Sequence, residues 1–93
     1  MKATLNGAVI AESSDIIDDS GYHYFPRSAV RMDWLQKSDK TARDLECPHG
    51  VQFYDVVIEG ERHPRVAWSY EAPKPSKAAI DHRIGFWKEV KLG

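Results

Sequence analysis

Glu46–Glu59, with the sequence ECPHGVQFYDVVIE, is the stretch that decides the fold. Its second half, Val51–Glu59, is rich in β-branched and aromatic residues, which predicts a strand of nine residues. Both faces of that strand are largely apolar, as expected of a central strand covered on two sides. Its first half turns through Cys47–Gly50, which holds the one cysteine of the chain and a histidine two positions on. The stretch therefore predicts the centre of the core and, beside it, the first candidate for chemistry.

An Asn-Gly pair near the start of the chain predicts a β-hairpin over Lys2–Glu12. Asn6 and Gly7 both tolerate the positive φ angles of a type I′ turn, which is a common turn of two-residue hairpins. Folding about this pair places Ala3 opposite Ile10 on one face of the hairpin.

The other elements are short and separated by turn residues. We expect strands at Ile16-Ile17, Tyr22–Phe25, Val30–Trp34, Val66–Tyr70 and Arg83–Leu92, the last one broken near Lys88. We expect one helical turn at Pro26–Ala29, a mobile loop at Gln36–Leu45, and a short helix capped by Ser76 that runs to about His82. This order predicts a mainly β fold. We expect a single small domain over residues 1–93, folded as a bent antiparallel sheet or an incomplete barrel with one or two short helices.

Composition narrows the class of protein. The chain has 93 residues, 42% of them hydrophobic, and 13 basic against 14 acidic residues give a net charge of -1. This balance argues against nucleic acid as a partner, and the absence of a long apolar run argues against a membrane span. A single cysteine excludes a disulfide within the chain and is typical of a reducing compartment, so we expect a cytoplasmic protein.

Cys47 and His49 are the sharpest candidates for catalysis. A thiol must lose its proton to attack at neutral pH, and a nearby imidazole can promote this. Cys47 would then be the nucleophile or anchor, and His49 or His23 the acid or base. The alternative is that Cys47 is a small buried hydrophobic residue beside a turn.

A metal site is a weaker hypothesis. His23, His49, His63 and His82 could join Cys47 around zinc, but no two of these histidines stand at the i, i+4 spacing of a helical site. We therefore predict no metal and no cofactor.

Charged and aromatic residues suggest a binding pocket. Arg31, Asp33, Lys74 and Arg83 stand in apolar or loop segments, and Arg31 is suited to hold an anion unless it simply pairs with Asp33. Trp68 and Tyr70 could stack on a planar ligand, although their shared face with Val66 also favours a place in the core. The segment Tyr70–Pro75 would form either the rim of such a pocket or a rigid crossover.

Three blocks carry a family resemblance. They are HYFP (His23–Pro26) followed by VRMDWL, the Cys47-Pro48 corner followed by VQFYDVVIEG, and AWSYEAPKP (Ala67–Pro75) followed by IDHRIGFW. Together they resemble the small bacterial family called domain of unknown function 427, which sometimes carries a nucleotidyltransferase label. The resemblance implies a bent, β-tent-like domain.

The chain departs from this family in its corner and from zinc-binding relatives in its cysteines. Many family members read Cys-Pro-aromatic-Lys-Gly at the corner, whereas this chain has Cys47-Pro48-His49-Gly50 and no lysine. Relatives of the same architecture that bind zinc use paired CxxC motifs, which this chain lacks, so that property does not carry over. Nor does it have the Gly-Ser motif with paired carboxylates that metal-assisted nucleotidyl transfer needs.

The sequence thus leaves three interpretations. The first is a small-molecule-binding protein or enzyme with a pocket that uses Cys47, His49, Arg31, His23 and Tyr70, joined by Trp68 and Lys74. The second is an interaction module that forms a homodimer through an edge strand, either Lys2–Leu5 or the last strand. The third is a structural domain without a site.

Overall fold

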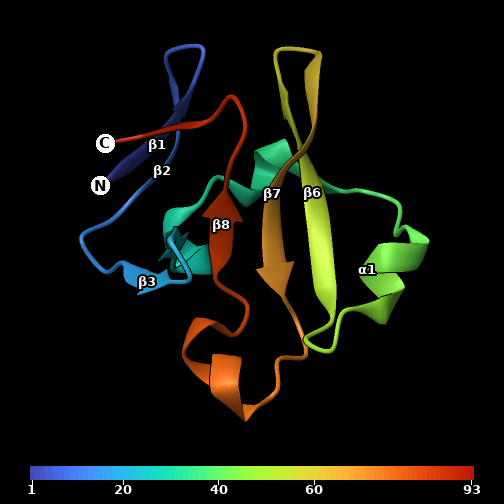
Figure 1. Ribbon diagram of the computed structural model, residues 1–93. Helices are drawn as coiled ribbons and strands as arrows, with labels where there is room; N and C mark the ends of the chain where they lie inside the picture. The colour runs from blue at the N-terminus through green and yellow to red at the C-terminus, as the bar shows by residue number, and fades with distance from the viewer.

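Nine strands form two antiparallel sheets in the computed structural model, which describes residues 1–93 (Figure 1). The larger sheet has six strands in the order β3-β4-β8-β7-β6-β5, and the smaller has the order β2-β1-β9. The strands are β1 (Lys2–Leu5), β2 (Ala8–Glu12), β3 (Ile17–Asp19), β4 (Tyr22–Phe25), β5 (Leu35–Lys37), β6 (Val51–Ile58), β7 (Glu61–Tyr70), β8 (Ile84–Phe86) and β9 (Lys91–Leu92). The strands make up most of the regular structure, so the expected mainly β fold is confirmed. The two sheets do not close into a barrel.

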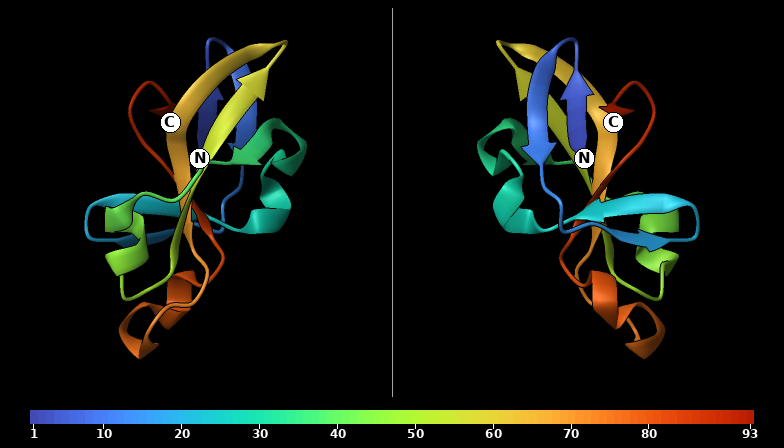
Figure 2. Two further views of the ribbon diagram at one scale, coloured as in Figure 1. Left: turned by 90° about the vertical axis from the view of Figure 1, so that its right-hand side faces the viewer. Right: turned by 90° about the vertical axis from the view of Figure 1, so that its left-hand side faces the viewer.

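The helical segments are short. They are the α-helix α1 (Ala42–Glu46) and three 3-10 helices, Arg27–Ala29, Met32–Trp34 and Pro75–Ile80. None of them has the length and apolar character that crossing a bilayer requires. Figure 2 shows that α1 and the β3–β4 hairpin, which forms one edge of the bent sheet, extend to the same side of β6 and β7. The first two 3-10 helices and the β1–β2 hairpin lie on the opposite side. We call these the outer and inner sides.

The predicted central strand is confirmed as β6, which pairs with β7 on one edge and β5 on the other. The β6–β7 hairpin turns at Glu59-Gly60, where both residues have positive φ. Along β6, Tyr54 and Val56 belong to one buried cluster, while Val51 and Phe53 belong to another. The apolar character of both faces therefore reflects burial on both sides of the sheet.

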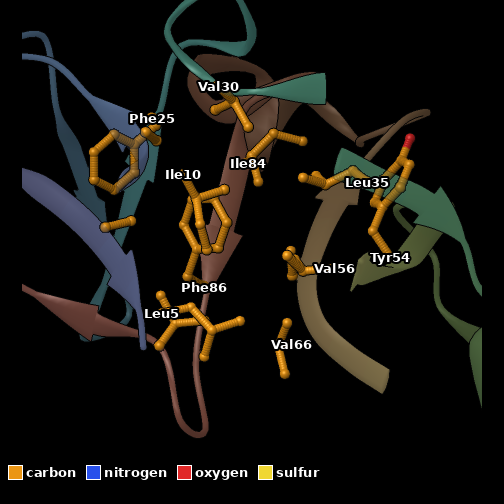
Figure 3. Close-up of a cluster of buried hydrophobic side chains, with 14 residues drawn as sticks. Leu5, Ile10, Phe25, Val30, Leu35, Tyr54, Val56, Val66, Ile84 and Phe86 are labelled. Atoms are coloured by element: carbon orange, nitrogen blue, oxygen red, sulfur yellow. The ribbon is translucent and has the colours of Figure 1, made fainter. Parts of the chain in front are cut away.

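The main core fills the space between the two sheets. Figure 3 shows Leu5 and Ile10 of the small sheet next to Phe86 and Val56 of the large one. Leu5, Ile10 and Val56 are almost fully buried. Each buried aliphatic side chain of this kind contributes about 1.5–3 kcal/mol to folding, so this core holds the sheets together.

The start of the chain folds as a hairpin, as expected, but its register differs. Asn6 and Gly7 have φ angles of 50° and 82°, which fit the predicted turn. Ala3 lies opposite Ala11 and not Ile10, because the pairing shifts by one residue between Ala3 and Thr4. A bulge of this type is not visible in the alternation of residue types.

The strand predicted over Val30–Trp34 is wrong. Met32–Trp34 is a 3-10 helix, and the strand begins only at Leu35. Val30 forms only an isolated bridge with Ala11, and the Arg31 N–H donates to Ile10 O at 2.8 Å, so this segment is bonded to β2 and not to the large sheet. The mobile loop predicted over Gln36–Leu45 is also wrong, since it contains most of β5 and of α1.

Two smaller expectations are corrected near the end of the chain and at the sheet edge. The last helix begins at Pro75 with Lys74 at its N-cap, so Ser76 is not the cap. Lys2–Leu5 is not an edge strand, because β1 lies between β2 and β9. The last predicted strand, broken near Lys88 as expected, divides into β8 in the large sheet and β9 in the small one.

Candidate functional site

A row of aromatic side chains crosses the outer face of the large sheet. The register places Phe53 of β6 opposite Trp68 of β7, and Gly85 of β8 lies between Trp68 and Tyr24 of β4. A Cβ atom at Gly85 would lie 2.8 Å from Trp68 Cζ2, so the indole occupies the space that a side chain would take. Trp68 Nε1 donates to the Tyr24 hydroxyl oxygen at 3.3 Å across this glycine. The glycine thus allows the indole to extend over β8.

Six hydrophobic residues alone line a shallow hollow of about 150 Å³ on this face. We call it the aromatic hollow, and its residues are Tyr22, Val51, Phe53, Trp68, Tyr70 and Trp87. The ring centroids of Tyr22 and Trp68 are 5.0 Å apart and those of Trp68 and Trp87 are 5.6 Å apart, both edge to face. Trp68 is buried, whereas Tyr22 is 40% exposed at the rim. A concave aromatic surface of this kind is typical of small-molecule sites.

A larger hollow of about 720 Å³ adjoins the aromatic hollow and reaches α1. The two hollows share four lining residues, which are Val51, Phe53, Tyr70 and Trp87. The rest of its lining is Thr41–Asp44 and Arg65. We call it the adjoining hollow. Together the two form one continuous surface with an aromatic floor and a polar margin.

An ion pair fixes α1 against the sheet at this margin. The guanidinium of Arg65 donates to both carboxylate oxygens of Asp44, at 3.0 and 3.1 Å, and these bonds hold the pKa of Asp44 below its usual value. Asp44 also forms a reciprocal capping box with Thr41 at the start of α1. The Arg65 guanidinium lies 4.0 Å from the ring centroid of Phe53. Arg65 therefore links the helix to the aromatic floor.

Arg65 reaches this position because β7 bulges there. Its φ is 54°, and its N–H donates to Asp55 Oδ1 at 3.0 Å. The bulge also corrects an expectation: Val66 packs in the inner core, while Trp68 belongs to the outer cluster. The two residues do not share a face, because the irregular backbone breaks the alternation between them.

The Cys47–Gly50 corner lies at one end of the aromatic floor. The Gly50 N–H donates to Cys47 O and closes the corner. Two further backbone bonds join the corner to the segment after β7: the Glu71 N–H donates to Gly50 O, and the Ala72 N–H donates to His49 O. Gly50 has a φ of 64°, and a Cβ atom there would lie 3.0 Å from the Ala72 Cβ. Only glycine satisfies both the backbone angle and this close approach.

His49 is held by the segment that follows β7. The Lys74 backbone N–H donates to His49 Nδ1 at 3.0 Å, so the neutral imidazole carries its proton on Nε2. Its ring contacts Tyr70 with centroids 5.5 Å apart. Cys47 is half-buried and packs against the outer cluster that contains Trp68 and Val51. No hydrogen bond joins the Cys47 thiol to the His49 imidazole.

The structure brings together five of the seven residues expected at a site: Cys47, His49, Trp68, Tyr70 and Lys74. Lys74 takes part through its backbone, and its side chain is exposed. The other two lie elsewhere. Arg31 pairs with Asp33 and lies 4.3 Å from the ring centroid of Trp34. His23 pairs with Asp18 on the β3–β4 hairpin.

The histidines do not gather around a common centre. His82 pairs with Asp81, and His63 contacts Glu89 and Glu61 at the far end of β7. The structure holds no group of three or more His, Cys, Asp or Glu side chains that could bind a metal ion.

Arg27 forms a polar network that nothing in the sequence pattern indicated. Its guanidinium donates to Ser69 Oγ at 2.9 Å and to Glu71 Oε2 at 3.0 Å, and the Tyr54 hydroxyl donates to the same Glu71 oxygen at 2.7 Å. Burial opposes the charge of Arg27, but the hydrogen bonds to Tyr54 and Glu71 raise its pKa. No hollow opens on this network, so we interpret it as a structural tie between the 3-10 helix Arg27–Ala29, β6 and the end of β7.

Comparison with known proteins places the chain in a family. One sequence profile, described as Domain of unknown function (DUF427) and labelled NTP_transf_9, matches residues 1–92 of the 93-residue chain. The chain belongs to this family. No curated protein matches it. Membership in the DUF427 family thus agrees with the resemblance seen in the three sequence blocks, and the description attaches no substrate or reaction to it.

Arg43, Phe53 and Arg65 line the adjoining hollow of this DUF427 chain and were not among the site residues expected from the sequence. Phe53 was predictable from the sequence, because it shares with Val51 the face of the strand opposite to that of Tyr54. Arg43 and Arg65 were not. Arg43 stands in a segment expected to be a loop, and the place of Arg65 depends on a bulge.

Proposed function

We propose that this DUF427 domain binds a small molecule that carries a planar apolar group, and that the aromatic hollow receives this group. The observation that carries the proposal is the lining of the hollow, which consists of Val51 and five aromatic side chains. Aromatic pairs contribute about 0.5–1.5 kcal/mol each beyond the burial of their area, so several rings around one ligand ring give useful affinity.

The size of the two hollows indicates how the ligand would lie. Sites for drug-sized ligands have about 300–1,000 Å³. The aromatic hollow, at about 150 Å³, is smaller than this and suits one ring system. The adjoining hollow, at about 720 Å³, has room for the rest of the molecule. The ligand would therefore place its ring over Trp68 and extend toward α1.

Isothermal titration calorimetry tests the proposal directly. Titration with 2-naphthalenemethanol, a neutral two-ring probe, should give a saturable heat of binding. Tyr22→Ala should weaken the binding by about tenfold, because an exposed rim ring is removed at a cost of about 1.4 kcal/mol.

A matched control is Val9→Ala, since Val9 is also 40% exposed but lies on β2 of the other sheet. This variant should bind the probe as the parent does. Absence of saturable binding, or equal losses in Tyr22→Ala and Val9→Ala, would contradict the proposal.

Catalysis by Cys47 and His49 is a second candidate function, favoured by the packing of Cys47 against the cluster that forms the hollow floor. The rate of alkylation by iodoacetamide at about pH 7 tests it, because an activated thiol carries more thiolate than a free one. A rate above that of free cysteine, which falls when His49 is changed to Ala, would support a nucleophile. A rate no higher than that of free cysteine would remove this candidate.

A homodimer through an edge strand is the alternative from another class. The outer edges of the sheets are formed by β3 and β5 in the large sheet and by β2 and β9 in the small one. Of the two edges expected from the sequence, only the last strand, β9, has this position. Light scattering after size exclusion would test it, and a monomer at high concentration would end the alternative.

A further inference from the structure

We propose that the ligand of the aromatic hollow is a small aromatic anion, and that Arg43 and Lys88 bind its negatively charged group. This inference rests on the proposed function, because it concerns the same surface. It adds a chemical class for the ligand and two residues that the sequence did not indicate.

Arg43 is the first of these residues. It lines the adjoining hollow together with the floor residues Phe53, Tyr70 and Trp87. Its side chain is exposed and takes part in no ion pair or side-chain hydrogen bond. A free guanidinium offers a planar fork of donors that matches a carboxylate or phosphate.

The helix that carries Arg43 is held in place, so the ligand does not have to order the backbone at this residue when it binds. The helix begins with the capping box of Thr41 and Asp44, and Asp44 is held by Arg65. Arg65 itself is not free to bind a ligand, because Asp44 takes its donors and Phe53 lies under its guanidinium. We therefore regard Arg65 as a positioning residue.

Lys88 is the second residue. It follows Trp87 directly, and its Nζ lies 5.1 Å from the centroid of that ring. Lys88 is exposed. Trp87 lines both hollows, so this ammonium lies against a ring that the two hollows share, although Lys88 itself lines neither of them.

The charge of the surface is complementary to an anion. Among the lining residues of both hollows, Arg43 and Arg65 are positive and Asp44 alone is negative, so 2 − 1 leaves one positive charge. Outside the lining, Lys88 adds a positive charge beside Trp87, and the carboxylate of the adjacent Glu89, which contacts His63, lies near it. The whole chain has a net charge of -1, so this positive margin differs in sign from the molecule as a whole. The combination of an aromatic floor with cations at its margin favours a ring that carries a carboxylate or phosphate.

A pair of probes with the same ring separates the charge from the stacking. We would measure binding of 2-naphthoate and of 2-naphthalenemethanol to the protein by isothermal titration calorimetry in low-salt buffer. We expect naphthoate to bind several-fold more tightly, and we expect the difference to shrink at about 0.5 M NaCl, because salt screens exposed charges. Arg43→Gln should reduce naphthoate binding by about two- to fivefold, as expected for an exposed ion pair. It should leave binding of the alcohol unchanged.

The control and the contrary outcomes are defined by the same pair. Lys91→Gln removes an exposed cation from β9 of the small sheet and should change neither affinity. The double variant Arg43→Gln, Lys88→Gln should bind both probes equally.

If the parent protein already binds both probes equally, this inference fails while the proposed function stands. If neither probe binds, both fail. An equal loss for both probes in Arg43→Gln would show that Arg43 supports the hollow and does not recognise charge, which would also overturn the inference.

Discussion

Gly85 is the residue on which the geometry of the aromatic floor depends most directly. A side chain at this position would collide with the Trp68 ring at 2.8–2.9 Å and with Tyr24 at 3.1 Å. Trp68 is only 5% exposed and is paired on both neighbouring strands, so it has little room to move.

We therefore expect Gly85→Ala to lower the free energy of unfolding by about 1–3 kcal/mol, as overpacked cores do. It should also reduce the near-UV circular dichroism of the tryptophans, because the contact between Trp68 and Tyr24 is disturbed. Urea unfolding measures the first effect. Gly93→Ala is the control, since no atom lies within 4 Å of a Cβ at that position. Equal stability of the two variants would contradict this account of the floor.

Single residues also explain why part of the candidate site was predictable. Cys47, His49 and the segment that begins at Tyr70 belong to two short blocks, and backbone hydrogen bonds join these blocks directly. Arg31 was expected at the same site, but its carboxylate partner Asp33 stands only two residues away. A local partner is available in any fold, so a charged residue near an opposite charge is a weak indicator of a site.

Helix α1 is the element whose placement matters most for the surface, and Asp44 holds it there. Arg65 lowers the pKa of the Asp44 carboxyl. A group with a lowered pKa in the folded state stabilises the fold above its unfolded-state pKa of about 3.9. This contribution to stability is lost as the pH falls through the lowered pKa that Asp44 has in the folded state.

Asp44→Asn should lower the free energy of unfolding at about pH 7 by about 1.5–3 kcal/mol, because hydrogen bonds between charged groups are lost. The difference from the parent should become smaller between about pH 4 and pH 2, where the parent carboxylate is protonated as well. Urea unfolding across this range measures both effects.

Asp33→Asn is the matched control, because Asp33 also has a lowered pKa and an arginine partner but lies on the surface. It should change the stability far less than Asp44→Asn does. If the two variants behave alike, the buried position of Asp44 has no special effect on α1.

Elements of this chain were predictable where local chemistry defines them. The Asn6-Gly7 hairpin, the strand at Tyr22–Phe25 and most of Val51–Glu59 follow from turn residues and residue type, and the structure has them. Helix α1 was missed because its main support is the ion pair with Arg65, which comes from a distant part of the sequence. A five-residue helix has too few hydrogen bonds of its own to be stable alone.

At the scale of the whole molecule, the mainly β character was clear from the sequence, but the division into two sheets was not. The segment expected as one broken strand near the end contributes β8 to the large sheet and β9 to the small one. Which strands pair depends on contacts between distant residues, and alternation within a segment does not encode them. The aromatic floor arises in the same way, because it collects side chains from β4, β6, β7 and the end of β8.

The pairing of β9 with β1 has a consequence for how the protein folds during synthesis. The Lys2 N–H donates to Gly93 O at 2.7 Å, and the Gly93 N–H donates to Lys2 O at 3.0 Å, so the first strand and the last lie side by side (Figure 1). On the ribosome, the β1–β2 hairpin can form early, but one edge of β1 must wait until Leu92 has emerged. During that interval the nascent chain exposes an unpaired strand edge, which is a site for aggregation or chaperone binding. The small sheet therefore stays incomplete until β9 is available to pair with β1.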